Sequence, residues 1–563
     1  MKVVIVGGVA GGATAAARIR RLDENAEIIV FERSGYISYA NCGLPYYIGG
    51  TIEDRKALTL QTPESFDRRF NVTIKVNHEV TKINPDKKTV EVKDLISGEK
   101  FEESYDKLLL SPGARPVIPA VPGVESDKVF YLRTVEDTFK IKDYVNEHGI
   151  KNAVLIGGGF ISVELSENLT ESGIKTTIIQ RPKQLMNIFD GDMAAFIHGE
   201  LRKNGVELKL GRALTALEES EAGIDVILDG VERLHADIVV MAIGVSPESE
   251  LAKKAGLELG VKGSIVVNEK METSVKDIYA VGDAVQVKNF VTKADTVIPL
   301  AGPANKQGRI AADNICGGNS EYKGSQGSSV LKVFELTAAT TGINEKEADR
   351  AGIEYEKIII SPMSHASYYP GGKLMNVKFL YEKGTYRILG AQIVGYDGVD
   401  KRIDVLATAL RAGLTAIDVK ELELSYAPPY SSAKDPVNML GYIAENIKTG
   451  VVKQWHMEDI DRVQSDNNSI ILDTRSVKEY ERGHMENSVN IPVDEIRKRI
   501  NEIPKNKKIY TICQSGLRSY VATRILMGHG YDAYNFSGGY RYYNTVKDEK
   551  TLVEASTPCG MDK

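Results

Sequence analysis

The chain has 563 residues, of which 42% are hydrophobic and 26% are charged, a composition typical of a globular protein with several cores. At about 150 residues per domain, we expect roughly four domains. The 71 Lys and Arg against 77 Asp and Glu give a net charge of −6, and no basic run marks a surface for phosphates. Nucleic acids are therefore not expected partners.

The four cysteines, Cys42, Cys316, Cys513 and Cys559, are widely spaced and form no CxxC pair. This pattern disfavours a disulfide scaffold or a zinc site, so we predict single thiols in a reducing compartment and no metal. The opening MKVVIVGG leads directly into a strand, and no apolar run reaches the length of a membrane span. We predict a cytoplasmic protein without a membrane partner.

The first elements form a strand, a glycine-rich turn and a helix. VVIVGG at residues 3–8 reads as a buried strand, AGGATAAARIRRL as the following helix and EIIVFE, ending at Glu32, as a second strand. The same order returns at residues 153–180, where AVLIGGG precedes a helix and the strand KTTIIQ. Two such units predict two nucleotide-binding domains.

The second half contains less regular patterns. YAVGDA at residues 279–284 is followed by an alternating segment at 329–395 and a helix-rich stretch to about Asn446. NIKTGVVKQW reads as a connection, and SIILDTR opens a short α/β pattern that runs to about Val546. The polar tail at residues 548–563 is expected to be poorly ordered.

The first glycine turn predicts a dinucleotide site. Gly7, Gly8, Gly11 and Gly12 allow a tight turn whose helix N-terminus offers N–H groups to a pyrophosphate. Glu32 lies where a carboxylate would accept hydrogen bonds from ribose hydroxyls, although Val9 occupies the middle glycine position of GxGxxG.

A second segment makes the prediction of a dinucleotide site more specific. The letters TxxxxIYAxGD, ending in Gly282 and Asp283, resemble the second FAD fingerprint of flavoproteins with two dinucleotide-binding domains. In that resemblance, the Asp contacts the ribityl chain of the flavin. Together the two fingerprints predict bound FAD.

The second glycine turn predicts a nicotinamide cofactor. Gly157 and Gly159 open the turn, and Ser162 stands where the third glycine would be. Gln180 and Arg181 replace the acid that would favour NADH by repelling a 2′-phosphate. The choice between NADH and NADPH therefore stays open.

The stretch SYANCGLPYY at residues 38–47 carries a lone cysteine, Cys42, with Tyr47 where a CxxxxC partner would fall. Here the chain resembles the pyridine nucleotide-disulfide oxidoreductases, in the branch with coenzyme A-disulfide reductase, NADH oxidase and NADH peroxidase. The resemblance covers about residues 1–446. A single redox thiol must find its partner sulfur outside the protein or become a sulfenic acid, and we predict that Cys42 is catalytic.

Two tyrosines favour a coenzyme A substrate. Tyr368 in SHASYYPGG and Tyr426 in SYAPPYSSAKDP resemble the coenzyme A-disulfide reductase pattern, in which both come from the partner subunit and lie near the thiol. A phenol can donate a proton to a leaving thiolate, and a helix N-terminus or cation can hold Cys42 as thiolate. The same resemblance implies coenzyme A contacts at Thr14, Arg18, Arg21, Ser38, Asn41 and Lys434.

Residues 463–545 resemble a rhodanese domain through LDTRSVKEYERGH, CQSGLRS and FSGGYRYY. The six-residue loop from Cys513 to Arg518 can surround an anion with backbone N–H groups and a guanidinium, which suits a thiolate or a persulfide. We predict that Cys513 carries sulfur and that Asp473 and Arg475, with His484, maintain the fold. Cys316 is interpreted as structural, and the role of Cys559 stays open.

The expected fold class is α/β with four domains. They are an FAD-binding domain at 1–115 and 241–325, an NAD(P)H-binding domain at 116–240, an α+β dimerisation domain at 326–448 and a rhodanese domain at 463–550. The first two are expected to be Rossmann-like three-layer domains.

The sequence therefore predicts a homodimeric FAD enzyme that uses NAD(P)H to reduce coenzyme A disulfide, coenzyme A persulfide or polysulfide through Cys42, while Cys513 transfers sulfur. An alternative is an NADH oxidase or peroxidase that cycles Cys42 as a sulfenic acid. Another is chiefly a thiosulfate sulfurtransferase. The physiological sulfur compound, and whether the two thiols exchange sulfur within or between subunits, stay open.

Overall fold

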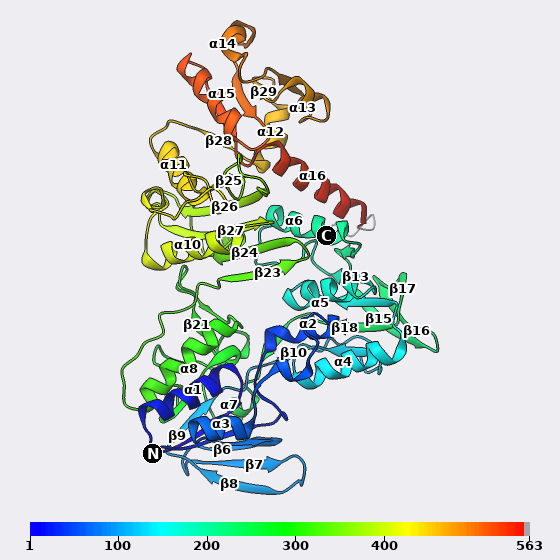
Figure 1. The fold of residues 1–563 in the computed structure, drawn as a ribbon, viewed down its shortest axis with the longest axis vertical. Coiled ribbons are helices and arrows are strands. Elements are labelled where there is room, and N and C mark those ends of the chain that lie inside the picture. Colours follow the sequence, from blue (N-terminus) through cyan, green and yellow to red (C-terminus); the bar gives the residue numbers. More distant parts are fainter. Residues whose placement is uncertain (557–563) are drawn as a thin grey trace. The chain divides into compact units, whose positions relative to one another are not determined.

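The computed structural model describes residues 1–556, and its ribbon is drawn in Figure 1. The chain divides into two compact units. The first combines Met1–Pro182 with Gly205–Gly327, and the second combines Lys183–Asn204 with the chain from Ser328 onward. Within residues 1–556, we find no helix long and apolar enough to cross a membrane.

The first unit opens with a parallel sheet in the order β20-β9-β1-β2-β5. Its strands are β1 (Lys2–Val6), β2 (Glu27–Glu32), β5 (Thr73–Val76), β9 (Lys107–Leu110) and β20 (Ile278–Ala280). Their apolar runs are buried on both faces, as parallel strands require. Helices α1 (Ala10–Leu22) and α8 (Ala301–Ile315) pack against each other beside this sheet (Figure 1).

A second parallel sheet in the same unit has the order β11-β18-β12-β13-β14. Its strands are β11 (Val129–Tyr131), β12 (Asn152–Ile156), β13 (Lys175–Gln180), β14 (Glu207–Leu210) and β18 (Ile238–Met241), with helices α4 (Val135–His148) and α5 (Phe160–Glu171). The two sheets confirm the predicted pair of βαβ units. Each βαβ turn lies at the carboxyl end of its strands, where such sheets bind ligands.

Smaller elements complete this unit. Two antiparallel sheets are formed by β6 (His78–Asn84), β7 (Thr89–Asp94) and β8 (Lys100–Ser104), and by β15 (Leu214–Ser220), β16 (Gly223–Leu228) and β17 (Glu232–Ala236). The short strands are β3 (Ile37–Tyr39), β4 (Thr59–Gln61), β10 (Ala114–Pro116), β19 (Val245–Pro247), β21 (Val287–Lys288) and β22 (Asp295–Thr296). The short helices are η1 (Asn41–Gly43), α2 (Leu44–Gly49), η2 (Arg55–Leu58), α3 (Pro63–Phe70), α7 (Glu250–Lys254), η3 (Val261–Gly263) and η4 (Gly282–Ala284).

The second unit contains an antiparallel sheet in the order β23-β24-β27-β26-β25. Its strands are β23 (Ser329–Val333), β24 (Leu336–Gly342), β25 (Tyr355–Ile360), β26 (Met375–Glu382) and β27 (Ile388–Gly395). Its helices are α6 (Gly191–Lys203), α9 (Glu345–Arg350), α10 (Val399–Ala412), η5 (Asp418–Glu421) and α11 (Pro436–Lys448). Both α6 and α10 pack on this sheet, so its central strands are buried and lose the expected alternation of exposure.

The rest of the second unit is a parallel sheet in the order β28-β32-β31-β29-β30. Its strands are β28 (Gln454–Trp455), β29 (Ser469–Asp473), β30 (Ser488–Asn490), β31 (Lys508–Ile512) and β32 (Ala533–Phe536). Its helices are η6 (Met457–Asp459), α12 (Ile460–Ser465), α13 (Val477–Glu481), α14 (Ile496–Arg499), η7 (Ile500–Glu502), α15 (Leu517–Gly528) and α16 (Gly539–Ser556). The predicted α/β fold class is confirmed.

Two sequence expectations are corrected here. Trp455, read as part of a connection, lies in β28 with its side chain buried, and its indole N–H donates to the carbonyl of Thr511 at 3.1 Å. The tail from residue 548 was expected to lack order, but α16 continues to Ser556.

The helical tail is held by ion pairs. Glu549 accepts a 2.9 Å hydrogen bond from His198 and pairs with Arg202, both on α6, and Figure 1 shows α16 beside α6. These partners lie 351 and 347 residues away, so local polarity could not reveal them. Residues 557–563, including Cys559, lie outside the described part of the chain.

Candidate functional site

The turn between β1 and α1 requires its glycines. Gly7 has φ +96°, and a Cβ there would lie 2.1 Å from the carbonyl oxygen of Ser111. A Cβ on Gly12 would lie 1.9 Å from the carbonyl oxygen of Gly7, and one on Gly11 would meet Val281 at 2.8 Å. The backbone therefore closes into a cradle at the N-terminus of α1 that side chains would fill, which fits the pyrophosphate of FAD.

Two predicted acids lie at carboxyl ends of the same sheet. Glu32 ends β2, and its buried carboxylate accepts hydrogen bonds from the backbone N–H groups of Gly8 at 2.8 Å and Ser34 at 2.9 Å. Burial raises the pKa of Glu32, while the two N–H donors oppose the rise. Asp283 follows Gly282 in η4 after β20 and pairs with Arg133 at 2.8 Å.

The second nucleotide turn has a similar backbone. Gly157 has φ +118°, and a Cβ there would lie 2.2 Å from the carbonyl oxygen of Ala242. Gly159 caps α5 and faces open space. Ser162, at the third glycine position, is fully buried and its hydroxyl has no hydrogen-bond partner among the described residues. This polar atom beside a helix N-terminus fits a cofactor phosphate or ribose.

Cys42 lies in η1, which directly precedes α2. The Cys42 residue is exposed. The pKa of its thiol is raised by partial removal from water and by the negative charges of Glu164 and Asp283, and Arg133 opposes this rise. Arg133 is the cation that favours the Cys42 thiolate, but the removal from water and the two acids outweigh it. The two nearby acids favour the neutral thiol.

Glu164 was not among the site residues predicted from the sequence. It lies on α5, which packs against α2, and it accepts a hydrogen bond from the hydroxyl of Tyr46 at 3.5 Å. Burial raises the pKa of Glu164 to about 7. A carboxyl group that titrates near neutrality therefore lies close enough to influence Cys42.

Tyr47 occupies the position of the missing second cysteine. Its ring packs edge-on against Phe139 with 5.7 Å between the centroids. Cys42, Cys316 and Cys513 are all free thiols. A disulfide partner for Cys42 is therefore not supplied by a neighbouring cysteine of this motif.

The other residues predicted to contact coenzyme A in the first unit are partly paired. The hydroxyl of Thr14 donates to Asn305 at 2.7 Å, and Arg18 pairs with Asp313 at 2.7 Å, both partners lying on α8. Arg21 is exposed, Asn41 lies beside Cys42, and Ser38 has φ +43°. Thr14, Arg18 and Arg21 share one face of α1 through their i, i+4, i+7 spacing.

The second unit brings the two predicted tyrosines together. The phenol oxygens of Tyr368 and Tyr426 are 2.6 Å apart, and both side chains are largely exposed. The shared hydrogen bond raises the pKa of Tyr426. Lys434 is also exposed. Two coupled phenols on a surface can donate a proton to a sulfur atom brought to them.

A buried ion pair braces the segments that carry these tyrosines. Arg402 on α10 donates to the carboxylate of Asp435 at 3.0 Å, to the carbonyl of Ser364 at 2.8 Å and to the hydroxyl of Ser431 at 3.3 Å. The N–H of Ala366 donates to the carbonyl of Ser431 at 3.0 Å. Neither Arg402 nor Asp435 was singled out from the sequence, because their partners lie in separate segments.

Cys513 ends β31 and opens the loop before α15. Its side chain is fully buried, and its sulfur accepts hydrogen bonds from the Gly516 N–H and the Ser519 hydroxyl, both at 3.2 Å. Gly539 packs against this loop, because a Cβ there would lie 2.7 Å from the backbone of Ser515. The loop can hold a negative sulfur with neutral donors.

Arg518, whose guanidinium is predicted to help surround an anion, is paired with a carboxylate in the structure. Its guanidinium donates two parallel hydrogen bonds, each 2.7 Å long, to the carboxylate of Glu479 on α13. The sequence analysis did not single out Glu479, although the Ser476-x-x-Glu479 spacing of a capping box was a local signal. Asp473 and Arg475 form a buried pair at 2.6 Å, in keeping with the structural role predicted for them.

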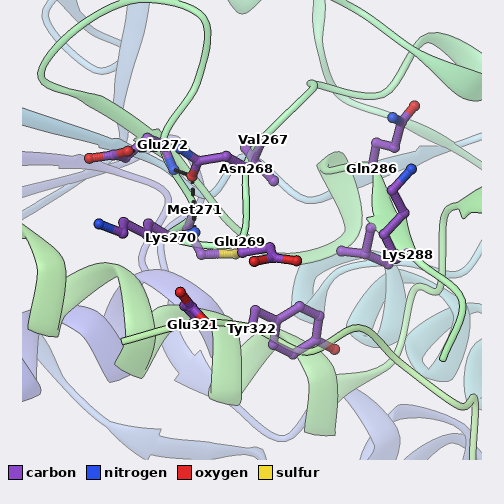
Figure 2. A pocket seen from close by; sticks show the side chains of 11 residues that line it. Val267, Asn268, Glu269, Lys270, Met271, Glu272, Gln286, Lys288, Glu321 and Tyr322 are labelled. Carbon is purple, nitrogen blue, oxygen red and sulfur yellow. Dashed lines mark hydrogen bonds between the residues drawn. The ribbon is translucent and has the colours of Figure 1, made fainter. Parts of the chain in front are cut away.

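Two further features carry none of the predicted residues. Asp190, Asp192 and Glu345 cluster as acids could around a metal, but the ammonium group of Lys378 pairs with all three. A hollow of about 440 Å³ in the first unit is lined by residues 267–272, 286–288, 321 and 322 (Figure 2). In this hollow, the side-chain amide of Asn268 donates a hydrogen bond to the carboxylate of Glu272 at 2.7 Å.

Comparison with known families agrees with this architecture. Residues 1–308 match the family described as pyridine nucleotide-disulphide oxidoreductase, residues 328–436 match its dimerisation domain, and residues 456–545 match the rhodanese-like domain.

Several known proteins are similar. Coenzyme A disulfide reductase of Staphylococcus aureus (strain JH9) is 39% identical over 445 residues, which cover 79% of this chain and all of the relative. The structure of reduced Bacillus anthracis CoADR-RHD has a TM-score of 0.95 at 51% identity and covers 97% of this chain and 98% of its own. The structure of an NAD-dependent persulfide reductase from A. fulgidus has a TM-score of 0.91 at 36% identity. The match covers 96% of this chain and 100% of the reductase chain.

These matches confirm the resemblance expected from the sequence. The chain belongs to the pyridine nucleotide-disulphide oxidoreductase family, as an oxidoreductase with a dimerisation domain and a carboxyl-terminal rhodanese-like domain.

Proposed function

We propose that this protein is a homodimeric reductase of coenzyme A disulfide and coenzyme A persulfide, with Cys42 as the redox thiol. The observation that carries the proposal is that Cys42 is an exposed, free thiol with Tyr47 in place of a second cysteine. A disulfide reductase with one thiol must form its disulfide with the substrate. The printed names of the similar proteins, a coenzyme A disulfide reductase and a persulfide reductase, support this substrate class.

The chemistry balances in two steps. The Cys42 thiolate attacks the inner sulfur of coenzyme A persulfide, forming a mixed disulfide and releasing hydrosulfide; with coenzyme A disulfide, the leaving group is a coenzyme A thiolate. When bound, FAD and a nicotinamide cofactor supply the two electrons that cleave the mixed disulfide. With the uptake of one proton, this cleavage yields the Cys42 thiol and the coenzyme A thiolate.

The protein's own residues set the conditions for this attack. Partial removal from water, followed by Glu164 and Asp283, raises the pKa of Cys42, so its thiolate needs a compensating donor when substrate binds. The proposal assigns that task to Tyr368 and Tyr426 of the partner subunit, whose phenols are coupled at 2.6 Å. Arg18, Arg21 and Lys434 are proposed to pair with the phosphates of coenzyme A.

The rhodanese-like domain is proposed to hold sulfur as a persulfide on Cys513. Its buried sulfur already accepts two hydrogen bonds, so a negative sulfur is stabilised there. The nicotinamide preference is proposed to extend to NADPH, because Gln180 and Arg181 replace the acid that would repel a 2′-phosphate.

The deciding experiment is intact-mass and peptide mass spectrometry of protein purified without reductant. We expect coenzyme A bound through a disulfide to the peptide that contains Cys42, released by dithiothreitol. A sulfenic or sulfinic acid at Cys42, together with oxygen uptake that matches NADH consumption without a sulfur substrate, would instead indicate an oxidase.

A further inference from the structure

The loop around Cys513 holds its sulfur without a free positive charge. The donors to the sulfur are the Gly516 N–H and the Ser519 hydroxyl, both neutral groups at 3.2 Å. Gly516 has φ +97°, a backbone conformation that favours glycine. The direct hydrogen bonds to a sulfur anion of charge −1 therefore come from dipoles, and Arg518 interacts with Cys513 only through its charge.

The nearest loop cation, Arg518, is neutralised by Glu479. The two side chains form a bidentate pair with both distances at 2.7 Å. Ser476 fixes the carboxylate further, because its hydroxyl donates to Glu479 at 2.8 Å and its N–H at 3.0 Å. Arg518, Ser476 and the capping contact lower the pKa of Glu479 to about 2, so the pair carries no net charge at neutral pH.

The second arginine at this loop is also compensated. Arg475 pairs with the buried Asp473 at 2.6 Å and donates to the carbonyl of Gly483 at 2.8 Å. Its remaining contact with the loop is a hydrogen bond to the side-chain oxygen of Gln514 at 3.3 Å. Both guanidinium groups that reach this loop thus have a carboxylate of their own.

Apolar side chains lie exposed on the elements that carry the ion pair. Leu517, which precedes Arg518, is 61% exposed, and Val521, one helical turn later, is 40% exposed. Val477, two residues before Glu479 on α13, is 51% exposed. The two helices that carry the Arg518–Glu479 pair therefore also present exposed apolar side chains.

We infer that Glu479 makes the Cys513 site select organic persulfides over small dianionic sulfur donors such as thiosulfate. A dianion at the loop needs cationic donors, but Glu479 occupies both terminal nitrogens of Arg518 and would repel it. Coenzyme A persulfide brings its pantetheine arm to the loop with a terminal persulfide of at most one negative charge, while its phosphates stay at the far end of that arm. The loop dipoles and the apolar side chains beside the loop accept this end of the molecule. This inference rests on the proposed sulfur-carrying role of Cys513.

The transfer needs no outside oxidant or reductant. The Cys513 thiolate attacks the outer sulfur of R–S–SH, the S–S bond of the donor breaks, and Cys513–S–SH and R–S⁻ form. With thiosulfate, the same attack releases sulfite. The two donors therefore test the same bond-making step and differ in charge and apolar content.

The test compares thiosulfate and coenzyme A persulfide as donors to the full-length holoprotein, with cyanide as acceptor and thiocyanate as the measured product. We expect Glu479→Gln to raise kcat/KM for thiosulfate about tenfold, which corresponds to about 1.4 kcal/mol. The value for coenzyme A persulfide should change less than twofold. The gain should fall as ionic strength rises, because it depends on a freed guanidinium.

Glu481→Gln is the matched control, because Glu481 lies exposed on the same helix, and its donor ratio should equal that of the wild type. Glu479→Asp keeps the negative charge and should restore the wild-type ratio. An unchanged donor ratio in Glu479→Gln, or an equal loss with both donors that Glu479→Asp rescues, would overturn the inference. If Glu479→Gln does not fold, a Glu479→Asp variant with a shifted ratio would also overturn it.

Cys513→Ser separates this inference from the proposed function. Loss of transfer from both donors supports the role of Cys513, whatever the ratio in Glu479→Gln. Retention of transfer in Cys513→Ser would instead contradict the proposed function itself.

Discussion

Cys42 and Cys513 each lie close to the start of a helix, yet their surroundings treat a negative sulfur in opposite ways. The Cys42 residue is exposed, yet partial removal of its thiol from water, together with Glu164 and Asp283, raises its pKa. Cys513 is fully buried, and two donors point at its sulfur. The Cys42 site therefore depends on groups that bind to it to stabilise a negative sulfur, whereas the loop at Cys513 supplies the stabilising donors itself.

The largest expected effect separates the two thiols. Cys42→Ser should lower NAD(P)H-dependent reduction of coenzyme A disulfide by on the order of a thousandfold, because the proposed mixed disulfide forms on this thiol. Cys513→Ser should leave that reduction within about twofold, since its sulfur is not needed for it. Steady-state NAD(P)H oxidation measures both. Equal losses in the two variants would show that the sites do not act separately.

The second prediction concerns the support of the tyrosine pair that we assign to the Cys42 site of the partner. Arg402→Met leaves Asp435 buried without its cation, so the free energy of unfolding should fall by about 3–5 kcal/mol. Denaturant unfolding measures the loss. Asp404→Asn, at an exposed charged position on the same helix, is the control. A loss below about 1 kcal/mol would mean that the buried pair does not brace these segments.

A smaller effect tests the donors at Cys513. Ser519→Ala removes one of the two hydrogen bonds to the sulfur, which should slow persulfide transfer about tenfold, the scale of a hydrogen bond to a charged group. Ser465→Ala, elsewhere in the same domain, should be neutral. The thiocyanate assay with coenzyme A persulfide measures the rates. If the rate stays at the wild-type value, the loop N–H alone holds the sulfur.

The smallest effect tests the acids at Cys42. Glu164 has a pKa of about 7, so its ionisation between pH 6 and 8 adds negative charge near the thiol and opposes thiolate formation. Glu164→Gln should therefore lower the pKa of Cys42 and speed its alkylation by iodoacetamide about threefold at pH 8. At pH 5.5, where Glu164 is protonated, the two proteins should react alike. A slower reaction at pH 8 would reverse the assigned sign.

Local motifs made much of the fold predictable. The turns at Gly7 and Gly157 follow from short apolar strands and adjacent glycines, because a Cβ at these two positions would lie only 2.1 and 2.2 Å from a carbonyl oxygen. The loop at Cys513 is likewise defined by six consecutive residues. Such signals need no knowledge of distant segments.

Other features depend on partners far away in the chain. Residues 548–556 look like a polar tail, but the helix they form is tied to α6 through Glu549 and His198, 351 residues apart. The segments that carry the tyrosine pair are held by the ion pair between Arg402 and Asp435, which lie 33 residues apart. No local pattern assigns these partners, because polarity alone does not tell a solvated charge from a paired one.

The sequence by itself therefore determined the order of the domains, the two dinucleotide turns and the identity of the two thiols, since these depend on residues that are neighbours in the chain. The tertiary structure alone decided the charge around each sulfur. The charge of Glu164 on α5 raises the pKa of Cys42, and Glu479 on α13 pairs with Arg518. Electrostatic energy depends on distance in space rather than separation in sequence, so these settings became visible only once the elements were packed.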